Sequence, residues 1–357
     1  MSDPFRVGCC NEIPEPNWRW VADALTPLAL DWTFFSTAPQ TPAERLVRRP
    51  RLSRYRACRQ LAAGAVAGKF DLIFTHHPLV TCWTETFCRG RRSCPHVAFA
   101  FNFTRLPRSL RRNLMRRAFA TVDRFVVFSR FERELYSRHF QIPIGKLEMI
   151  QWGVREPAIA RTANASASRE VAGSDAICAV GTQARDYTTL LAAMRRLPHV
   201  RLILVASPQS VRGLTVPSNV TVRFDIPRLE AEAVIRDSRF LVLPLLHSQV
   251  PCGHVTMVTA MFLSRAILAT ESAGISDYLV PDYNGIVVPP GDPAALGAAI
   301  DKLWHDRETA CRLGQNGRAF ALANCTEERT IAYVRGVIER LRRERLSVGE
   351  QELDQRL

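Results

Sequence analysis

Glycine and arginine stand at the end of a predicted strand in AVGTQARDYTTLL, an arrangement suited to binding phosphate. The apolar run ends at Gly181, and Arg185 and Asp186 precede a segment with helical periodicity. A glycine at a strand end lets a ligand approach the backbone, and a planar guanidinium can form paired hydrogen bonds to a diphosphate. We expect Arg185 to bind an anion and place Asp186 at the same candidate binding site. An aspartate before a helix is more often a cap than a catalyst.

The segment PCGHVTMVTAM offers a second site for an anion. Its turn contains Cys252 and Gly253, and a predicted helix begins at His254, Val255 and Thr256, with no acidic side chain along the segment. The first turn of a helix has unpaired N–H groups and a partial positive charge, which together favour an anion. We predict that a diphosphate binds at this helix start and that His254 lines the same cleft.

A third strand end, in GIVVPPGDPAAL, is of a different kind. Asp292 is followed by a proline, and an N-cap aspartate before proline at the first helical position is a helix-start signal. We therefore interpret Asp292 as structural.

These residues need elements that bring strand ends together, and the sequence supplies them. Short apolar runs alternate with longer segments of helical periodicity, which is typical of an α/β doubly wound fold. Open parallel sheets bind ligands at the carboxyl ends of their strands, so strands and helix starts would meet at one edge. The expected strands are residues 6–10, 30–36, 71–75, 96–103, 124–129 and 147–152, followed by 176–181, 201–207, 220–224, 240–246, 266–270 and 285–290.

The length of 357 residues suits two domains better than one core. The stretch REPAIARTANASASREVAGSD is small, polar and without period, so it is a linker or a surface loop. We predict a first Rossmann-like domain over residues 1–155, a linker over 156–173, a second Rossmann-like domain over 174–330, and a terminal segment over 331–357 with a helix near 327–345.

The net charge of +14 is concentrated in the first part of the chain. Residues 1–150 carry 24 Lys and Arg against 12 Asp and Glu, a balance of +12, which leaves +2 for the rest. A one-sided charge suggests an anionic partner. Only three of the 48 basic residues are lysines, and an arginine excess this uniform also fits a bias in genomic composition.

The ten cysteines lack the paired spacing of a disulfide framework. Cys82, Cys88 and Cys94, with His96 close by, are separated by five-residue gaps, where zinc knuckles have gaps of about two to four. We predict free thiols and no metal site there. The chain has no uninterrupted apolar stretch long enough for a membrane span and no secretory signal at MSDPFRVGCC, so we expect a cytoplasmic protein.

The ordered set VGTQARDYTTLLAAM, LVLPLLHSQVPCGHVTMVTAM and AILATESAGISDYLVPDYNGIVVPPGDPAAL resembles the donor domain of GT-B glycosyltransferases of family 4. In the first half, DLIFTHHP resembles the family's strand-to-histidine turn, and VDRFVVFSRFERELYSRHFQIPIGKLEMIQWGV resembles the end of its acceptor domain. The resemblance covers roughly residues 70–340 and is stronger in the second half.

The resemblance implies a GT-B fold, in which two Rossmann-like domains face a cleft. It implies a nucleotide-sugar donor on the second domain, an acceptor on the first, a terminal helix returning to the first domain, and transfer with retention of configuration without metal or other cofactor. The sequence has no Asp-x-Asp, the manganese-binding signature of the other main glycosyltransferase fold. Catalysis would then consist of positioning and of stabilising the leaving diphosphate.

Two departures from the family pattern stand out. Many members carry two glutamates across the helix that PCGHVTMVTAM opens, and here Pro251 and Thr259 occupy those places. Thr259 keeps a hydroxyl for the ribose, but the sugar-side carboxylate is absent. Members also often have a histidine after the fourth strand of the acceptor domain, where this chain offers Asn102.

Two further features admit a functional and a structural interpretation. His76 and His77 follow a predicted strand and could orient the acceptor, although a histidine near a strand end has many structural uses. The stretch from Arg105 to Val122 has leucines four residues apart among six arginines. Through Arg105–Arg117 it could lie on an anionic membrane, or it could pack its leucines on the first domain.

We therefore expect a glycosyltransferase, cytoplasmic or peripheral on the inner face of the membrane, that uses a UDP- or GDP-linked sugar and an anionic, lipid-linked or polysaccharide acceptor. The alternative is a GT-B-like protein that has lost catalysis and serves as a binding or scaffolding partner, since the glutamate and histidine are missing. Nucleic acid is not an expected partner, because no recognition motif accompanies the basic charge.

Overall fold

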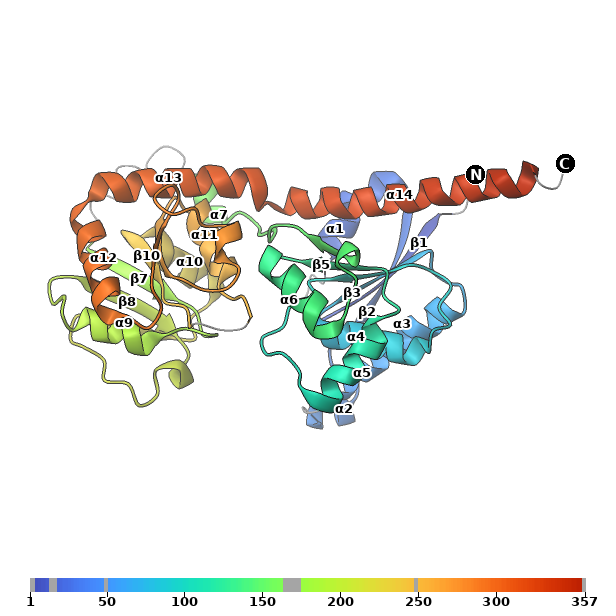
Figure 1. Ribbon diagram of the computed structural model, residues 1–357, viewed down its shortest axis with the longest axis horizontal. Coiled ribbons are helices and arrows are strands. Elements are labelled where there is room, and N and C mark those ends of the chain that lie inside the picture. Colours follow the sequence, from blue (N-terminus) through green and yellow to red (C-terminus); the bar gives the residue numbers. More distant parts are fainter. Residues whose placement is uncertain (1–3, 13–17, 48–50, 163–174, 247–249, 355–357) are drawn as a thin grey trace. The chain divides into compact units, whose positions relative to one another are not determined.

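Two parallel sheets organise the computed structural model, which describes residues 4–12, 18–47, 51–162, 175–246 and 250–354 (Figure 1). The chain divides into two units, and each contains one sheet. Unit 1 comprises Met1–Ile150 and Glu328–Leu357, and unit 2 comprises Gln151–Glu327.

The sheet of unit 1 has the strand order β2-β1-β3-β4-β5-β6, and all its pairs are parallel. The order runs outward from β1 in both directions, so the topology reverses between β1 and β3. The strands are β1 Phe5–Asn11, β2 Leu30–Ser36, β3 Leu72–His76, β4 His96–Phe99, β5 Arg124–Val127 and β6 Leu147–Met149.

Helices connect these strands. They are α1 Arg19–Ala24, α2 Pro42–Leu46, α3 Leu52–Val66, α4 Pro78–Cys88, α5 Ser109–Phe119 and α6 Arg130–Phe140, with short 3₁₀ turns at Thr26–Leu28 and Ile144–Lys146. The long last helix, α14 Glu327–Asp354, also packs on unit 1. Tyr333 donates a hydrogen bond to Glu148 at 2.6 Å, and the guanidinium of Arg342 donates to the Leu28 carbonyl at 2.6 Å.

The sheet of unit 2 has the order β12-β11-β10-β7-β8-β9, again with parallel pairs, and its topology reverses between β7 and β10. Its strands are β7 Ala176–Val180, β8 Arg201–Ala206, β9 Val220–Phe224, β10 Phe240–Leu243, β11 Ala266–Thr270 and β12 Ile286–Val288. Its helices are α7 Ala158–Thr162, α9 Tyr187–Met194, α10 Arg228–Arg236, α11 His254–Phe262, α12 Pro293–His305 and α13 Arg307–Asn324, with 3₁₀ turns at Pro208–Val211 and Ile275–Asp277.

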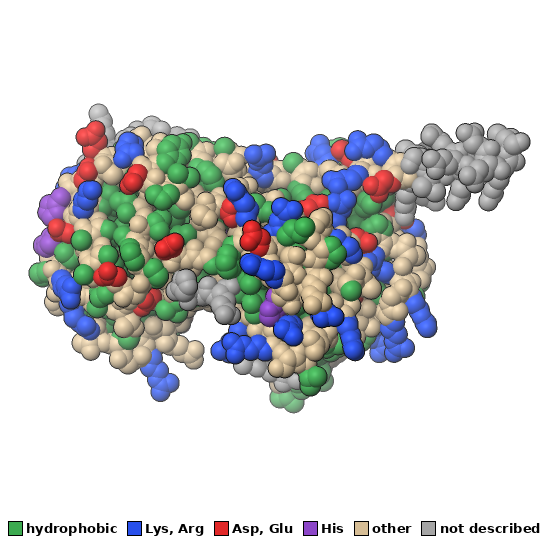
Figure 2. All heavy atoms as spheres, in the orientation of Figure 1, with side chains coloured by type: hydrophobic (Ala, Val, Ile, Leu, Met, Phe, Trp, Pro, Cys, Tyr) green, Lys and Arg blue, Asp and Glu red, His purple; other side chains and the backbone are tan. Residues whose placement is uncertain are grey.

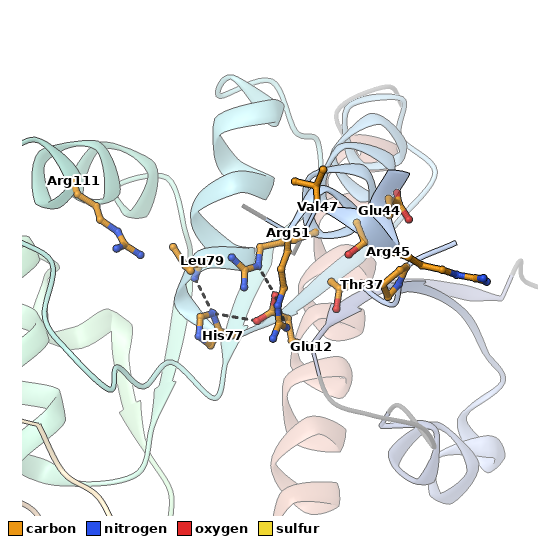
Figure 3. A pocket seen from close by; sticks show the side chains of 12 residues that line it. Glu12, Thr37, Glu44, Arg45, Val47, Arg51, His77, Leu79 and Arg111 are labelled. Carbon is orange, nitrogen blue, oxygen red and sulfur yellow. Dashed lines mark hydrogen bonds and ion pairs between the residues drawn. The ribbon is translucent and has the colours of Figure 1, made fainter. Parts of the chain in front are cut away.

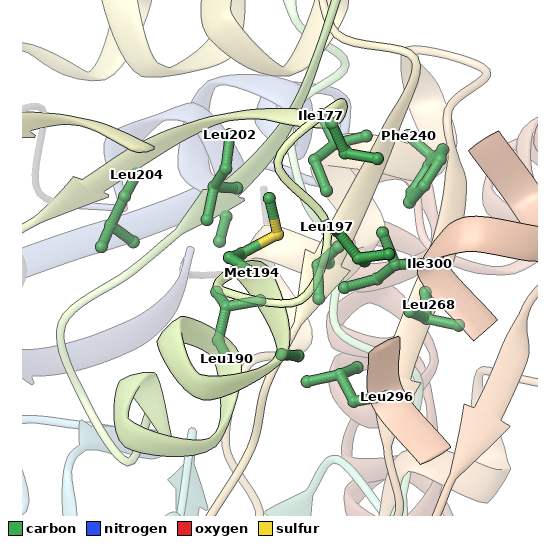
Figure 4. Packing of buried hydrophobic residues seen from close by; sticks show 14 of the residues in the cluster. Ile177, Leu190, Met194, Leu197, Leu202, Leu204, Phe240, Leu268, Leu296 and Ile300 are labelled. Carbon is green, nitrogen blue, oxygen red and sulfur yellow. The ribbon is translucent and has the colours of Figure 1, made fainter. Parts of the chain in front are cut away.

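Both faces of the second sheet are covered, which explains why its strands are continuous apolar runs. Phe240 and Val242 of β10 belong to a core cluster with α9 and α12 (Figure 4), whereas Leu241 and Leu243 pack in a second cluster with α11. Successive side chains of a strand point to opposite faces, so a strand buried on both sides needs apolar residues at every position. This is the doubly wound arrangement that the sequence predicts.

The predicted strands are all present, but several are shorter than expected; residues 240–246 form a strand only over Phe240–Leu243, and residues 285–290 only over Ile286–Val288. In two further cases the contacts explain where the chain leaves the sheet. Residues 96–103 leave the sheet after Phe99, where Ala100 has a positive φ of 49°, and Phe101 and Phe103 pack instead against Phe140. Residues 147–152 leave it after Met149, and the amide of Trp152 donates to the Tyr278 hydroxyl at 2.9 Å. The apolar runs continue past the ends of these two strands because the residues that follow pack in the contacts just described instead of pairing in the sheet.

The predicted linker is partly helical. Within residues 156–173, α7 spans Ala158–Thr162 and Ala160 is buried against the core of unit 2. The remainder of that prediction, residues 163–173, lies outside the described part of the chain.

Candidate active site

The switch point of the second sheet brings the two predicted phosphate segments together. Gly181 to Arg185 follow β7, and Pro244 to Gly253 follow its neighbour β10. The two connections are joined directly, because the Asp186 amide donates to the Pro244 carbonyl at 2.8 Å and the Leu246 amide donates to the Ala184 carbonyl at 3.0 Å. In open α/β sheets, ligands bind in the crevice at this position.

Arg185 folds back over the end of β7. Its guanidinium donates to the Gln183 carbonyl at 2.8 Å, to the Val180 carbonyl at 3.4 Å and to the Thr256 hydroxyl at 3.4 Å. Two of these three contacts are long for a charged donor, whose hydrogen bonds are usually about 2.7–2.9 Å. The guanidinium is therefore oriented toward the start of α11 without being saturated by the protein.

Two glycines lie beside this side chain. A Cβ at Gly181, where φ is 135°, would lie 2.5 Å from the guanidinium of Arg185, and a Cβ at Gly253, where φ is 88°, would lie 3.1 Å from Leu245 and 3.6 Å from Arg185. Both backbone conformations also disfavour any other residue. Gly181 therefore makes room for Arg185, whereas at Gly253 the positive φ and the contact with Leu245 are what require glycine.

The positive charge of Arg185 has no acidic partner among the residues that the structure describes. Its side chain is partly buried, and this burial lowers the pKa of its guanidinium. A partly buried cation without a counter-charge is costly unless a ligand supplies the charge. An anionic ligand at this position would supply the missing counter-charge.

The N-terminus of α11 is open where its neighbours are capped. Asp186 caps α9 by accepting from the Thr189 amide at 3.0 Å, and Asp292 caps α12 by accepting from the Ala294 and Ala295 amides at 2.9 Å. At α11 the N-cap is Gly253, with no capping side chain and no acid in the first turn. This leaves the amides of the first turn for an external acceptor.

Of the side chains around the start of α11, some are exposed and others already form hydrogen bonds within the protein. Val255 is 46% exposed, Thr256 is partly buried beside Arg185, and Cys252 is partly buried, which raises the pKa of its thiol. Thr259 is buried and donates its hydroxyl to the Val255 carbonyl at 2.8 Å. That oxygen keeps a lone pair, but not a proton, for a ribose hydroxyl.

His254 has a structural task. Its ring is buried, its Nε2 donates to the Gly274 carbonyl at 3.1 Å, and it packs on Tyr278 with ring centroids 4.6 Å apart. Burial lowers the pKa of His254, which keeps the imidazole neutral at pH 7. The residue ties the start of α11 to the turn after β11, and it does not offer a positive charge to the ligand.

Unit 1 has a cavity at its own switch point (Figure 3). The cavity has a volume of about 1220 Å³ and lies where Glu12 follows β1 and His77 follows β3. Four arginines line it against two glutamates. Its lining residues are Glu12, Thr37, Pro39, Glu44, Arg45, Val47, Arg51, Ser53, Arg54, His77, Leu79 and Arg111.

His77, which lines this cavity, has a strained backbone conformation. Its φ of 79° is unusual for a residue with a side chain, and its Nδ1 accepts from the Leu79 amide at 3.2 Å at the start of α4. The proton of the neutral ring is therefore assigned to Nε2. Burial lowers the pKa of His77, and the Glu12 carboxylate, 3.8 Å away, acts against that shift. Strain of this kind often marks a functional position.

Both glutamates that line the cavity form ion pairs with arginines, whereas two of the lining arginines form none among the described residues. Glu12 forms ion pairs with Arg54 and, at 4.0 Å, with Arg51, while Glu44 pairs with Arg56 at 2.8 Å. Arg45 and Arg111 are exposed and have no ion pair within the described part of the chain. The cavity therefore has an excess of positive charge.

His76 lies in the core instead. It is 3% exposed and packs against Trp18 and Phe99, at ring-centroid distances of 4.2 and 5.3 Å. Neither ring nitrogen has a hydrogen-bond partner among the described residues, and burial lowers the pKa of His76 to about 3. Of the two histidines, only His77 reaches the cavity.

Asn102 follows β4 and is partly buried, but it does not line the cavity of unit 1. Its amide nitrogen in the backbone donates to the Ala100 carbonyl at 3.0 Å. The side chain of Asn102 therefore lies near the carboxyl edge of the first sheet, and the structure assigns it no role.

The basic stretch forms a helix that does not bury its leucines. In α5 the buried side chains are Met115, Ala118 and Phe119, whereas Leu110 is 85% exposed and Leu114 is 43% exposed. Packing of these two leucines on the first domain, one of the two interpretations of the sequence, is therefore wrong. No helix among the described residues is sufficiently long and apolar to cross a membrane.

Among the described residues, Cys82, Cys88, Cys94 and His96 do not come together as a group that could hold a metal ion. Cys82, Cys88 and Cys94 are free and buried, as predicted. His96 is occupied on both ring nitrogens, by Glu85 at 2.5 Å and by Thr75 at 2.7 Å.

Sequence reasoning missed the residues that complete both sites. Glu12, Arg51 and Arg54 carry no motif, and only their positions after β1 and at the start of α3 bring them to His77. Glu271 was missed as well. It is an exposed carboxylate directly after β11, beside Thr270, whose hydroxyl bonds both to the amide and to the carbonyl of Leu245.

Comparisons with known proteins agree with this architecture. The family model described as "Glycosyl transferases group 1" matches residues 174–306, and the model described as "Glycosyltransferase Family 4" matches residues 29–156. An uncharacterized glycosyltransferase of Methanocaldococcus jannaschii is 29% identical over 112 residues, which is 31% of this chain and 31% of that protein. The chain thus matches about a third of the length of this curated relative.

Solved structures are similar over nearly the whole chain. Sucrose-phosphate synthase from Thermosynechococcus elongatus has a TM-score of 0.71 at 21% identity, covering 94% of this chain and 98% of that one. HepE from Anabaena, in complex with UDP, has a TM-score of 0.66 at 12% identity, covering 94% and 100%.

The fold is that of a GT-B glycosyltransferase. The chain thus contains a family 4 glycosyltransferase domain in its first half and a group 1 glycosyltransferase domain in its second half.

Proposed function

We propose that this protein transfers a sugar from a UDP- or GDP-linked donor to an anionic, lipid-linked or polysaccharide acceptor. The observation that carries the proposal is Arg185, a partly buried cation with no acidic partner in the described part of the chain, at the switch point of the second sheet. Together with the uncapped start of α11, it provides the two features that a diphosphate requires.

The donor would bind with its diphosphate between Arg185 and the amides of His254, Val255 and Thr256. HepE was solved in complex with UDP and with UDP-glucose, which supports a uridine donor. Cys252, just before this helix, and Thr259, within it, would lie close to the nucleoside.

The reaction would proceed by positioning and by electrostatic stabilisation of the leaving group. Negative charge develops on the diphosphate as the glycosidic bond breaks, and donors arranged beforehand around it lower the barrier. We propose that no metal or other cofactor takes part and that the anomeric configuration is retained. Turnover should persist in EDTA, and turnover that is lost in EDTA and restored by manganese would contradict this mechanism.

The acceptor would bind in the cavity of unit 1. Glu12 and the Nε2–H of His77 can accept from and donate to a sugar hydroxyl, and Arg45 and Arg111 can pair with an anionic group on the same molecule. This division of tasks suits an acceptor that is both hydroxylated and anionic. Asn102, at the edge of the same sheet, remains a candidate for contact with the reacting sugar.

An acceptor linked to a lipid would explain the rim of this cavity. Arg45, Arg51 and Arg111 line the cavity, and each is adjacent in sequence to an exposed leucine. These leucines are Leu46, Leu52 and Leu110, exposed by 85, 37 and 85%. Arginines for lipid phosphates and leucines for the acyl region are the composition of a surface that binds an anionic membrane. We propose that this rim and Arg105–Arg117 hold the protein on such a membrane.

Thermal-shift screening against UDP, GDP, ADP and TDP tests the donor site. A ligand at a concentration of 100 times its Kd stabilises the folded protein by about 2.7 kcal/mol, so one nucleotide should raise the Tm clearly. Hydrolysis or transfer of the matching sugar nucleotide then separates an enzyme from a binding protein. Absence of any shift with all four nucleotides would contradict the proposal.

A further inference from the structure

We propose that unit 2 carries a zinc-class metal site formed by His199, Asp301 and His305, separate from the donor site. These side chains come from two parts of the chain, the connection between α9 and β8 and the last turns of α12. Each offers one ligand atom, and the three atoms all lie within 4.8 Å of one another. Histidine and acidic side chains lie beside each other at the left edge of Figure 2.

The distances are close to those of a bound metal. The Nε2 atom of His199 lies 2.8 Å from Oδ1 of Asp301, and Nδ1 of His305 lies 3.6 Å from the same oxygen. Ligands placed 2.0–2.1 Å from a tetrahedral zinc ion are about 3.3 Å apart. The two distances lie on either side of this value, and the third, between the two histidine nitrogens, is at most 4.8 Å. In the metal-free protein Nδ1 of His305 donates to the Asp301 carbonyl at 2.9 Å, so a metal would replace this hydrogen bond and would require side-chain movements of about 1 Å.

The core behind the site holds the ligands in place. His199 lies between the buried residues Leu197 and Val200, and Asp301 directly follows the buried Ile300. Leu197 and Ile300 belong to one core cluster (Figure 4). The backbone positions of the ligands are therefore set by packing, which lowers the entropy lost when a metal binds.

The chemistry of the three groups selects the metal. Two imidazoles and one carboxylate suit zinc and its neighbours in the transition series, whereas magnesium and calcium prefer sites made of oxygen alone. The partial negative charge at the C-terminus of α12 adds attraction for a cation. The side chains of His199, Asp301 and His305 are 47, 43 and 67% exposed, so water can occupy the remaining coordination positions.

The position of the site indicates a structural task. His199 precedes the first residue of β8, and His305 is the last residue of α12, so both lie at the amino edge of the sheet. The donor segments follow the carboxyl ends of β7 and β10, at the opposite edge. The metal would join α12 to the connection after α9 and stabilise unit 2 without contacting the donor.

Calorimetric titration of zinc into the EDTA-treated, dialysed full-length protein tests this inference. We expect one zinc ion per chain and a higher Tm in zinc than in magnesium. His199→Gln and His305→Gln should each weaken zinc binding at least about tenfold, the lower bound for loss of a residue that only supports a metal site. His139→Gln, at a histidine in unit 1, is the matched control and should bind zinc normally.

Cobalt serves as a second probe, because the partly buried thiols Cys252 and Cys311 could also bind zinc. Cobalt at the proposed site should show no thiolate charge-transfer absorption. Zinc binding that is absent, or that is unchanged in a folded variant with both His199→Gln and His305→Gln, would overturn the inference. Removal of the metal should leave nucleotide binding intact, so failure of this inference is distinct from failure of the proposed donor site.

Discussion

Replacement of Arg185 by alanine should weaken nucleoside-diphosphate binding strongly while changing stability little. In the protein the guanidinium makes one short hydrogen bond, to the Gln183 carbonyl at 2.8 Å, and two longer ones of 3.4 Å, to Val180 and Thr256. A hydrogen bond between a charged group and a ligand contributes about 1.5–3 kcal/mol. The Kd for the diphosphate should therefore rise about 10- to 150-fold, since 1.4 kcal/mol corresponds to a factor of ten.

Isothermal titration calorimetry with the nucleotide identified by thermal shift measures this change. Arg185→Lys is the informative companion variant, because it retains the charge but loses the fork that pairs with two phosphate oxygens. We expect its affinity to lie between those of the original protein and Arg185→Ala. Equal affinity of all three proteins, each with an unchanged Tm, would refute the assignment of Arg185 to the donor diphosphate.

Three further predictions follow from other parts of the structure. Gly253→Val, which puts a branched side chain at φ 88° and 3.1 Å from Leu245, should abolish nucleotide binding in calorimetry, whereas Gly90→Val, at φ 69° with open space around it, should not. Leu110→Asn should reduce cosedimentation with anionic liposomes at least about tenfold, since burying a leucine contributes about 1.5–3 kcal/mol; an equal loss for Leu229→Asn, a 68% exposed leucine of unit 2, would contradict it. Burial raises the pKa of Glu132 from 4.5 to about 7, so the folded protein binds more protons than the unfolded one between these values and its unfolding free energy falls as pH rises through them. Glu132→Gln should remove about 3 kcal/mol of this fall, measured by urea denaturation at pH 5 and pH 8, and an identical pH dependence in both proteins would show that Glu132 is not the group involved.

The fold could be predicted from the sequence because both sheets are covered on two faces. A strand such as β10, with all four residues buried, leaves an apolar run that periodicity detects. The same signal failed at residues 100–103, where the apolar run continues but the chain has left the sheet. Phe101 and Phe103 are buried in an aromatic cluster, and a buried phenylalanine has the same composition in a strand as in a packed loop.

The proposed donor site could be located from the sequence because its residues are local in sequence. Gly181 and Arg185 are four positions apart, and Gly253 begins the helix that they face, so strand-end rules apply directly. The role of each residue was harder to predict from the sequence. His254 bonds to the Gly274 carbonyl from a position that also fits a ligand, and the choice between the two depends on a turn twenty residues away.

The cavity of unit 1, the proposed acceptor site, illustrates the opposite case. Its charged residues, among them Glu12, Arg51, His77 and Arg111, are spread over a hundred positions and share no motif. In a chain with 45 arginines the individual ones carry no signal. They become informative only when the fold shows which acids neutralise them. Glu12 and Glu44 are each paired, so the positive charge of Arg45 and Arg111 remains, and this uncompensated charge, more than the net charge of the chain, is the argument for an anionic acceptor.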